Sequence, residues 1–129
     1  MLLESAIDLN EEGSYPFEIE SGKLSFTSLI RSVVEDIHSG RSTGSIAAKF
    51  HHTLVQLILQ LSLEIRAESG LDRVVLGGGS FQNNFLSEKV MDKLENENFK
   101  VYLPHRIPVN DQGIAAGQVA IGAHRQKLL

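Results

Sequence analysis

The alternation of apolar and polar residues predicts a β-hairpin near the start of the chain. Positions 15–20 and 23–26 alternate in polarity on either side of the turn Ser21-Gly22, which is the pattern of two short, half-buried strands. Pro16 has no main-chain N–H and therefore favours an edge position for the first strand. Residues 1–26 are otherwise the least regular part of the sequence.

Helical periodicity begins directly after the hairpin. Apolar residues recur at helical spacing from Leu29 to Ile37, and Thr27 or Ser28 is expected to cap this helix. The acidic Asp36 then falls largely on its outer face. A turn that contains glycine ends the helix and leads into a second, longer periodic stretch.

The second helix is predicted to begin near residues 42–45 and to end near residues 69–70. About 25 residues correspond to a length of roughly 37 Å, and the breadth of the apolar surface implies burial on more than one side. His51 and His52 lie near its front, where adjacent side chains point roughly 100° apart and cannot both bind one ion. We interpret one histidine as a core-edge residue beside Phe50 and the other as solvated.

The second half of the chain has the pattern of two strands and two helices in alternation. Residues 73–76 and 99–103 are short apolar runs, and a helical pattern over 81–94 separates them. This spacing is that of a right-handed crossover between parallel strands. A last helix over 111–123 is rich in small residues, which would press it against the sheet or a neighbouring helix. Residues 73–123 are thus expected to form one βαβα unit.

A triple glycine, Gly77-Gly78-Gly79, directly follows the first of these strands. Glycine allows a ligand to approach the main chain closely, and the N–H groups at the helix start offer donors to an anionic or polar group. The same residues are equally compatible with a plain turn between a buried strand and a helix. The glycines alone leave both interpretations open.

Asn110 and Asp111 follow the second strand, after a segment that Pro104 and Pro108 keep extended. Ligands bind at the carboxyl ends of parallel strands. We therefore expect this pair and the glycine loop to lie at the same sheet edge. Asn110 and Asp111 also have a structural explanation as cap and first-turn residues of the last helix.

Composition narrows the classes of function. The 129 residues suit a single α/β domain, and a net charge of −4 with a pI near 5.7 argues against a nucleic-acid-binding surface. The chain contains no cysteine, so any metal would need His, Asp, Asn or Glu ligands. The sequence has neither a long apolar run nor a basic start, and we expect a cytoplasmic protein without a membrane span or signal peptide.

Two motifs in combination resemble the C-terminal end of HypF-type carbamoyltransferases, which are hydrogenase maturation proteins. The first motif is GGSFQN at 78–83 and the second is PVNDQGIAAGQ at 108–118. Four upstream segments are similar to the same region of the family, so the resemblance covers nearly the whole chain. These segments are residues 2–5, 15–17, 35–40 and 46–54.

The resemblance implies one RNase-H-like lobe of the actin-like ATPase fold, with a short N-terminal β-hairpin and then helices around a small mixed sheet. In that fold two lobes close over a nucleotide, and residues 1–129 are similar to the second lobe only. The N-terminal lobe and the upstream modules of the same enzyme are then missing partners. We accordingly expect the chain to be a fragment.

The resemblance also implies site residues and cofactors. The aspartate of the family's Asn-Asp motif binds a divalent metal, which implies Asp111, and the family's paired histidine ligands belong to the missing first lobe. His51-His52 does not match that histidine motif. The implied contacts to ATP or carbamoyl adenylate are Gly77, Gly78, Gly79, Asn83 and Asn110.

The activity that the resemblance implies is carbamoyl transfer in nickel-iron hydrogenase maturation. The whole enzyme would convert carbamoyl phosphate and ATP into carbamoyl adenylate and then carbamoylate the C-terminal cysteine of HypE. We expect the isolated lobe to be inactive, because one carboxylate cannot hold a catalytic metal alone. The alternatives are a non-catalytic nucleotide-binding or assembly module, with a homo-oligomer formed through an exposed apolar face, and a tRNA threonylcarbamoyltransferase-like protein.

Overall fold

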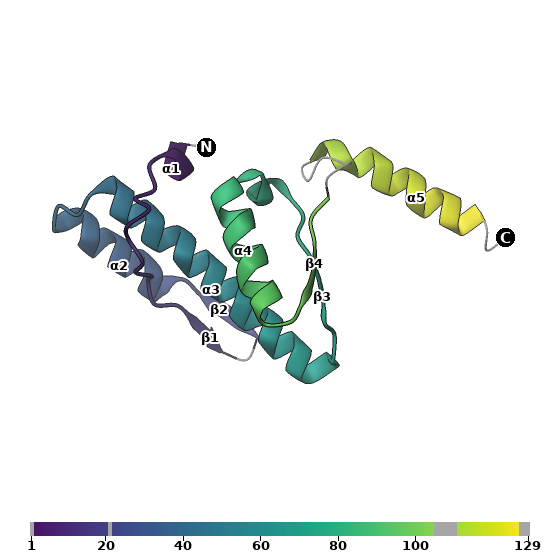
Figure 1. Cartoon of the computed structure of the whole chain (residues 1–129), viewed down its shortest axis with the longest axis horizontal. Coiled ribbons are helices and arrows are strands. Elements are labelled where there is room, and N and C mark those ends of the chain that lie inside the picture. The colour runs from purple at the N-terminus through teal and green to yellow at the C-terminus, as the bar shows by residue number, and fades with distance from the viewer. Residues whose placement is uncertain (1, 21, 105–110, 127–129) are drawn as a thin grey trace.

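Figure 1 shows the chain as a computed structural model, which describes residues 2–20, 22–104 and 111–126. Within that part of the chain, no helix is long and apolar enough to cross a membrane. Two 3₁₀ turns, over Gly79–Gln82 and Asp111–Gly113, accompany the regular elements. These elements are α1 (Leu2–Ser5), β1 (Glu18–Glu20), β2 (Lys23–Ser25), α2 (Thr27–His38), α3 (Thr43–Ser69), β3 (Arg73–Val75), α4 (Asn84–Asn96), β4 (Lys100–Tyr102) and α5 (Ile114–Gln126).

The predicted hairpin is present but shorter than expected. β1 and β2 are antiparallel, with Glu18 opposite Ser25. The predicted cap of α2 is wrong, because Thr27 is already the first helical residue and Phe26 occupies the N-cap position. Ser28 donates its hydroxyl to the Glu18 carboxylate at 2.7 Å instead. Among the described residues, no side chain caps this helix.

The long central helix follows its sequence signals closely. Ser42 is its N-cap and accepts the N–H of Ser45 at 3.1 Å, and Gly70 ends it in the left-handed conformation at φ 73°. The 27 residues of α3 span about 40 Å. This helix runs between α2 on one side and α4 with the β3–β4 pair on the other (Figure 1).

The predicted parallel crossover is also confirmed. β3 and β4 pair in parallel, with Arg73 opposite Lys100 and Val75 opposite Tyr102. The two strands form a sheet separate from the hairpin, so the described part of the chain holds two small sheets. α3 and α4 cover one face of the β3–β4 pair and enclose a core of buried apolar side chains. These residues are Val55, Leu76, Leu86, Val90, Leu94 and Phe99.

The last helix differs from its prediction. Small residues were expected to press it against the sheet or a neighbouring helix, yet every residue of α5 is exposed. In Figure 1 this helix points away from the rest of the molecule. Alanine and glycine permit a close approach, but they bury little apolar surface themselves and therefore provide little free energy for packing.

Candidate functional site

The glycine loop leaves the sheet at the carboxyl ends of both strands. The parallel register and the hydrogen bond from the N–H of Leu76 to the carbonyl of Tyr102, at 2.8 Å, fix the start of the loop beside the end of β4. Gly77, Gly78 and Gly79 are all exposed there. The first of the two predicted segments therefore lies at the edge where ligands bind in parallel sheets.

Only one of the three glycines is required by the backbone. Gly78 has φ 96° and ψ 164°, a region that essentially glycine alone adopts. Gly77 and Gly79 have no left-handed φ, and a methyl group on either would meet no described atom within 4 Å. Among the described residues, nothing requires glycine at these two positions, so the main chain there stays open to a ligand.

The main-chain N–H groups of the loop also indicate that it is open to a ligand. Among the described residues, the main-chain N–H groups of Gly77, Gly78 and Gly79 have no hydrogen-bond acceptor. Consecutive exposed N–H groups at the end of a strand suit an anionic or polar ligand.

The far side of the loop is held rigidly. The N–H of Phe81 donates to the carbonyl of Gly78 at 3.1 Å, and the N–H of Asn83 donates to that of Ser80 at 3.2 Å. The Ser87 hydroxyl lies 2.8 Å from the Phe81 carbonyl and 2.9 Å from the Asn83 carbonyl. These contacts fix the 3₁₀ turn. Because the turn begins at Gly79, they also hold the end of the glycine loop.

Asn83 is buried rather than presented to a ligand. Only 3% of the residue is exposed. Its Oδ1 accepts the N–H of Leu86 at 2.9 Å as the N-cap of α4, and its Nδ2 lies 2.7 Å from Nε2 of His51. A direct contact between the Asn83 side chain and a nucleotide would require the amide to leave these partners.

The start of α4 is occupied as well, which corrects the expectation that its N–H groups are free. The N–H of Phe85 donates to the Glu4 carboxylate at 3.2 Å, and this bond lowers the pKa of Glu4 below its ordinary value. The N–H of Leu86 is taken by Asn83. The available donors thus belong to the glycine loop. Local sequence gave no signal for Glu4, because 81 positions separate it from its partner.

The second predicted segment is only partly described. Asn110 lies outside the described residues, and Asp111 is exposed at the start of the 3₁₀ turn Asp111–Gly113. No group of three or more potential metal ligands is present in the described ranges. The assignment of Asp111 as a metal ligand therefore stays a prediction.

The two histidines have different environments. His51 is 3% exposed, and its ring meets those of Phe50 and Phe85 edge-on, so one histidine is buried beside Phe50 as interpreted. His52 is not simply solvated. It is half-buried, its Nδ1 lies 3.2 Å from the carbonyl oxygen of Gly13, and its ring lies 5.7 Å from that of Phe85.

Comparison with known proteins identifies the family. The family model described as "Carbamoyltransferase, Kae1-like Domain, second subdomain" matches residues 1–118. The chain belongs to this carbamoyltransferase family. The expected resemblance to a C-terminal lobe of HypF-type carbamoyltransferases is thereby confirmed.

The chain spans only a small part of the length of the relatives that it matches. The carbamoyltransferase HypF of Synechocystis sp. is 35% identical over 91 residues, which are 70% of this chain and 11% of the relative. A crystal structure of full-length HypF in the phosphate- and nucleotide-bound form superposes with a TM-score of 0.88 at 37% identity, over 93% of this chain and 19% of the other. A tRNA N6-adenosine threonylcarbamoyltransferase of Prochlorococcus marinus is 26% identical over 117 residues, 86% of this chain and 32% of that protein.

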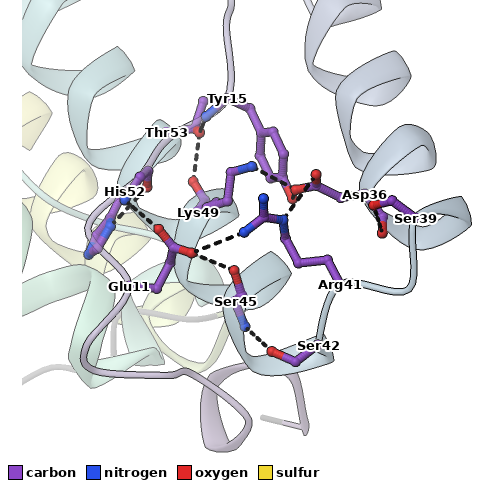
Figure 2. A network of polar contacts seen from close by, with 11 residues as sticks. Glu11, Tyr15, Asp36, Ser39, Arg41, Ser42, Ser45, Lys49, His52 and Thr53 are labelled. Atoms are coloured by element: carbon purple, nitrogen blue, oxygen red, sulfur yellow. Dashed lines mark hydrogen bonds and ion pairs between the residues drawn. The ribbon is translucent and has the colours of Figure 1, made fainter.

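A polar network attaches the N-terminal segment of the Kae1-like subdomain to α2 and α3 (Figure 2). The Asp36 carboxylate accepts hydrogen bonds from the Lys49 ammonium at 2.6 Å and the Tyr15 hydroxyl at 2.9 Å, and it forms an ion pair with Nε of Arg41 at 3.2 Å. The bond from Lys49 is the largest cause of the lowered pKa of Asp36. Burial, reinforced by Asp36, raises the pKa of Tyr15. Helical periodicity placed Asp36 outside, so sequence reasoning missed this centre.

Glu11 extends the network along the N-terminal segment. Its carboxylate accepts the Ser45 hydroxyl at 2.5 Å and the N–H of Gly13 at 2.8 Å, and these bonds lower its pKa. The main chain is joined to α3 too, because the N–H of Tyr15 donates to the Thr53 hydroxyl at 2.7 Å. The network therefore has an evident structural role in holding the start of the subdomain against α3.

Proposed function

We propose that this chain forms one wall of the nucleotide cleft in a HypF-type carbamoyltransferase. The observation that supports this most directly is the row of exposed main-chain N–H groups at Gly77, Gly78 and Gly79, which have no acceptor among the described residues. Such donors suit the phosphate side of ATP or of carbamoyl adenylate. The similar crystal structure is described as a phosphate- and nucleotide-bound form of HypF.

The residues of the proposed cleft have distinct roles. The three glycines donate main-chain hydrogen bonds, Asn83 holds the turn behind them, and Asn110 supplies a polar contact. Asp111 offers one carboxylate to a divalent metal, which when bound would neutralise phosphate charge or polarise the carbamoyl carbonyl. One carboxylate is too few ligands for a catalytic metal. The remaining ligands are expected from the first lobe of the enzyme.

The reaction that we propose for the whole enzyme has two stages. Carbamoyl phosphate and ATP yield carbamoyl adenylate, with release of inorganic phosphate and pyrophosphate, and the cleft then holds this adenylate for transfer. In the transfer, the sulfur of the C-terminal cysteine of HypE bonds to the carbamoyl carbon, the bond from that carbon to the adenylate oxygen breaks, and AMP leaves while the thiol proton is released. Such chemistry belongs in the cytoplasm and serves nickel-iron hydrogenase maturation.

Two alternatives have specific support. The match to a tRNA N6-adenosine threonylcarbamoyltransferase, at 26% identity, favours transfer of a related group to RNA, although the HypF relative is more similar at 35%. The exposed apolar side chains of α2 favour an assembly module, because Ile30 and Ile37 are 59% and 57% exposed. In that case the lobe would bind a separate first lobe or a second copy of itself.

Calorimetric titration tests the proposal. We expect ATP with Mg²⁺ to bind the chain alone only weakly, and binding to tighten when the remaining part of a HypF relative is added. The Asp111→Asn variant should lose the metal-dependent part of this gain while it keeps the fold. Tight binding by the chain alone would contradict a half-built cleft. Absence of binding in the reconstituted mixture would contradict the nucleotide role, and light scattering would reveal self-association.

A further inference from the structure

His51 connects the long helix to the junction between the glycine loop and α4. The residue belongs to α3, is 3% exposed, and has both ring nitrogens in hydrogen-bond contact. Nδ1 lies 2.7 Å from the carbonyl oxygen of Ala47, and Nε2 lies 2.7 Å from Nδ2 of Asn83. The second contact joins residues that are 32 positions apart in the sequence.

The partners determine which nitrogen carries the proton. The Ala47 carbonyl can only accept, so Nδ1 of His51 must be protonated. Oδ1 of Asn83 already accepts the N–H of Leu86, so the end of the amide that faces the ring is the NH₂ donor. Nε2 must therefore accept, and the imidazole is neutral with its proton on Nδ1. Any proton on Nε2 would place two donors against each other.

The surroundings prevent water from replacing this contact. The rings of Phe50 and Phe85 meet the His51 ring edge-on, with centroids 6.2 Å and 5.7 Å away. Asn83 is equally buried, at 3% exposure. Loss of the acceptor on His51 would leave the Asn83 NH₂ group buried without a partner, which is costly in a dry site.

We propose that His51 is a positioning residue for the glycine loop, acting through Asn83 as a neutral Nδ1–H imidazole. Asn83 is the point where the loop is fixed, because its N–H holds the Ser80 carbonyl and its own carbonyl accepts from Ser87. A displaced Asn83 would release the 3₁₀ turn and with it the N–H groups of the glycines. The consequence for ligand binding rests on the proposed nucleotide role, whereas the positioning itself does not.

Nitrogen-15 NMR of the imidazole in the full chain at neutral pH tests the tautomer. We expect a protonated Nδ1 and an unprotonated Nε2 for His51. An Nε2–H tautomer would overturn the proposal. In the Asn83→Asp variant, the N-cap acceptor is kept but an acceptor replaces the NH₂ donor, so we expect His51 to gain a proton on Nε2. An unchanged His51 spectrum in that variant would also overturn the contact.

Two substitutions of His51 test the positioning role by amide hydrogen exchange. His51→Leu fills the space but offers no acceptor, and we expect exchange at residues 80–87 to accelerate on the order of tenfold or more, with α2 unaffected. His51→Gln can place an amide oxygen near the position of Nε2 and should restore slow exchange. Equal loop exchange in His51→Leu and the wild type would overturn the proposal. If His51→Leu does not fold, the tautomer of His51 and its NMR spectrum in the Asn83→Asp variant still confirm or overturn the proposal.

ATP titration of the reconstituted mixture separates the two proposals. If the wild type binds ATP, we expect His51→Leu to weaken binding and His51→Gln to restore it, and undiminished affinity in folded His51→Leu would overturn the link to the ligand. If the wild type does not bind ATP, the proposed function fails. The NMR and exchange results then still confirm or overturn the role of His51 in holding the loop.

Discussion

α4 and α5 have the same length but opposite surroundings. Each contains 13 residues and each follows one strand of the parallel pair. α4 buries Leu86, Val90 and Leu94, whereas α5 exposes Ile114 and Val119 at 56% and 72%. The helix that follows β3 is thus packed within the chain, whereas every residue of the helix that follows β4 is exposed.

The spacing of apolar residues explains the difference. Leu86, Val90 and Leu94 are four positions apart, so they form one stripe along α4 that can face the core. In α5, Val119 points to the side opposite Ile114 and Ile121, and alanine and glycine fill the space between them. A helix without a continuous apolar stripe gains little from docking on one surface.

The largest expected effect contrasts the two helices directly. Leu94 is fully buried, so Leu94→Ala should lower the free energy of unfolding by about 2–5 kcal/mol, measured by urea denaturation. Ile121, which is 57% exposed on α5, serves as the control. Ile121→Ala should change the same quantity by no more than about 0.5 kcal/mol. A large loss in the control would show that α5 is packed in solution.

A smaller effect separates the glycines of the loop. Gly78→Ala should lower the free energy of unfolding by about 1–3 kcal/mol, because its φ of 96° is strained for alanine. Gly77→Ala should leave it unchanged or raise it by up to about 1 kcal/mol. Both substitutions should weaken ATP binding in the reconstituted mixture, whereas Gly117→Ala in α5 should not. Normal ATP affinity in Gly77→Ala would argue against close approach of the ligand at that residue.

The smallest expected effect is the loss of one hydrogen bond at the start of α4 as the pH falls. Because its bond to the N–H of Phe85 lowers the pKa of Glu4 in the folded state, this contact stabilises the protein above the unfolded value of 4.5 and is lost as the pH falls through the folded pKa. NMR of the Phe85 amide between pH 6 and pH 3 should show the loss, while α5 amides stay unchanged. Glu4→Gln should abolish the transition, and Glu12→Gln should retain it. A transition that survives Glu4→Gln would assign it to another carboxyl.

Local chemistry made much of the fold predictable. The Ser42 cap and Gly70 defined the ends of α3, and the alternation of apolar runs predicted the parallel strands. These features depend on residues that are close together in the sequence. Helical periodicity also predicted α2, yet it could not show that Asp36 faces inward, because Tyr15 and Lys49 create that environment only after folding.

The candidate site, too, was predictable only where its signals lie close together in the sequence. The glycine loop was predictable, since strand, glycine and helix signals are contiguous. The partners that fix it were not, because His51 and Glu4 reach it across 32 and 81 positions. In the described part of the chain, the donors without a partner consequently belong to the glycine loop and not to the helix start, where Glu4 and Asn83 already occupy the N–H groups of Phe85 and Leu86.

The attachment of Glu4 to α4 limits how the glycine-loop unit can be transplanted. The sequence pattern of residues 73–123 indicates a self-contained βαβα unit. However, the N–H of Phe85 donates to Glu4 in α1, near the start of the chain. A chimera that grafted only this stretch onto another scaffold would inherit the glycines without the carboxylate at the helix start or the imidazole behind Asn83. Any functional graft must therefore carry the first turn of the chain and the front of α3 along with the loop.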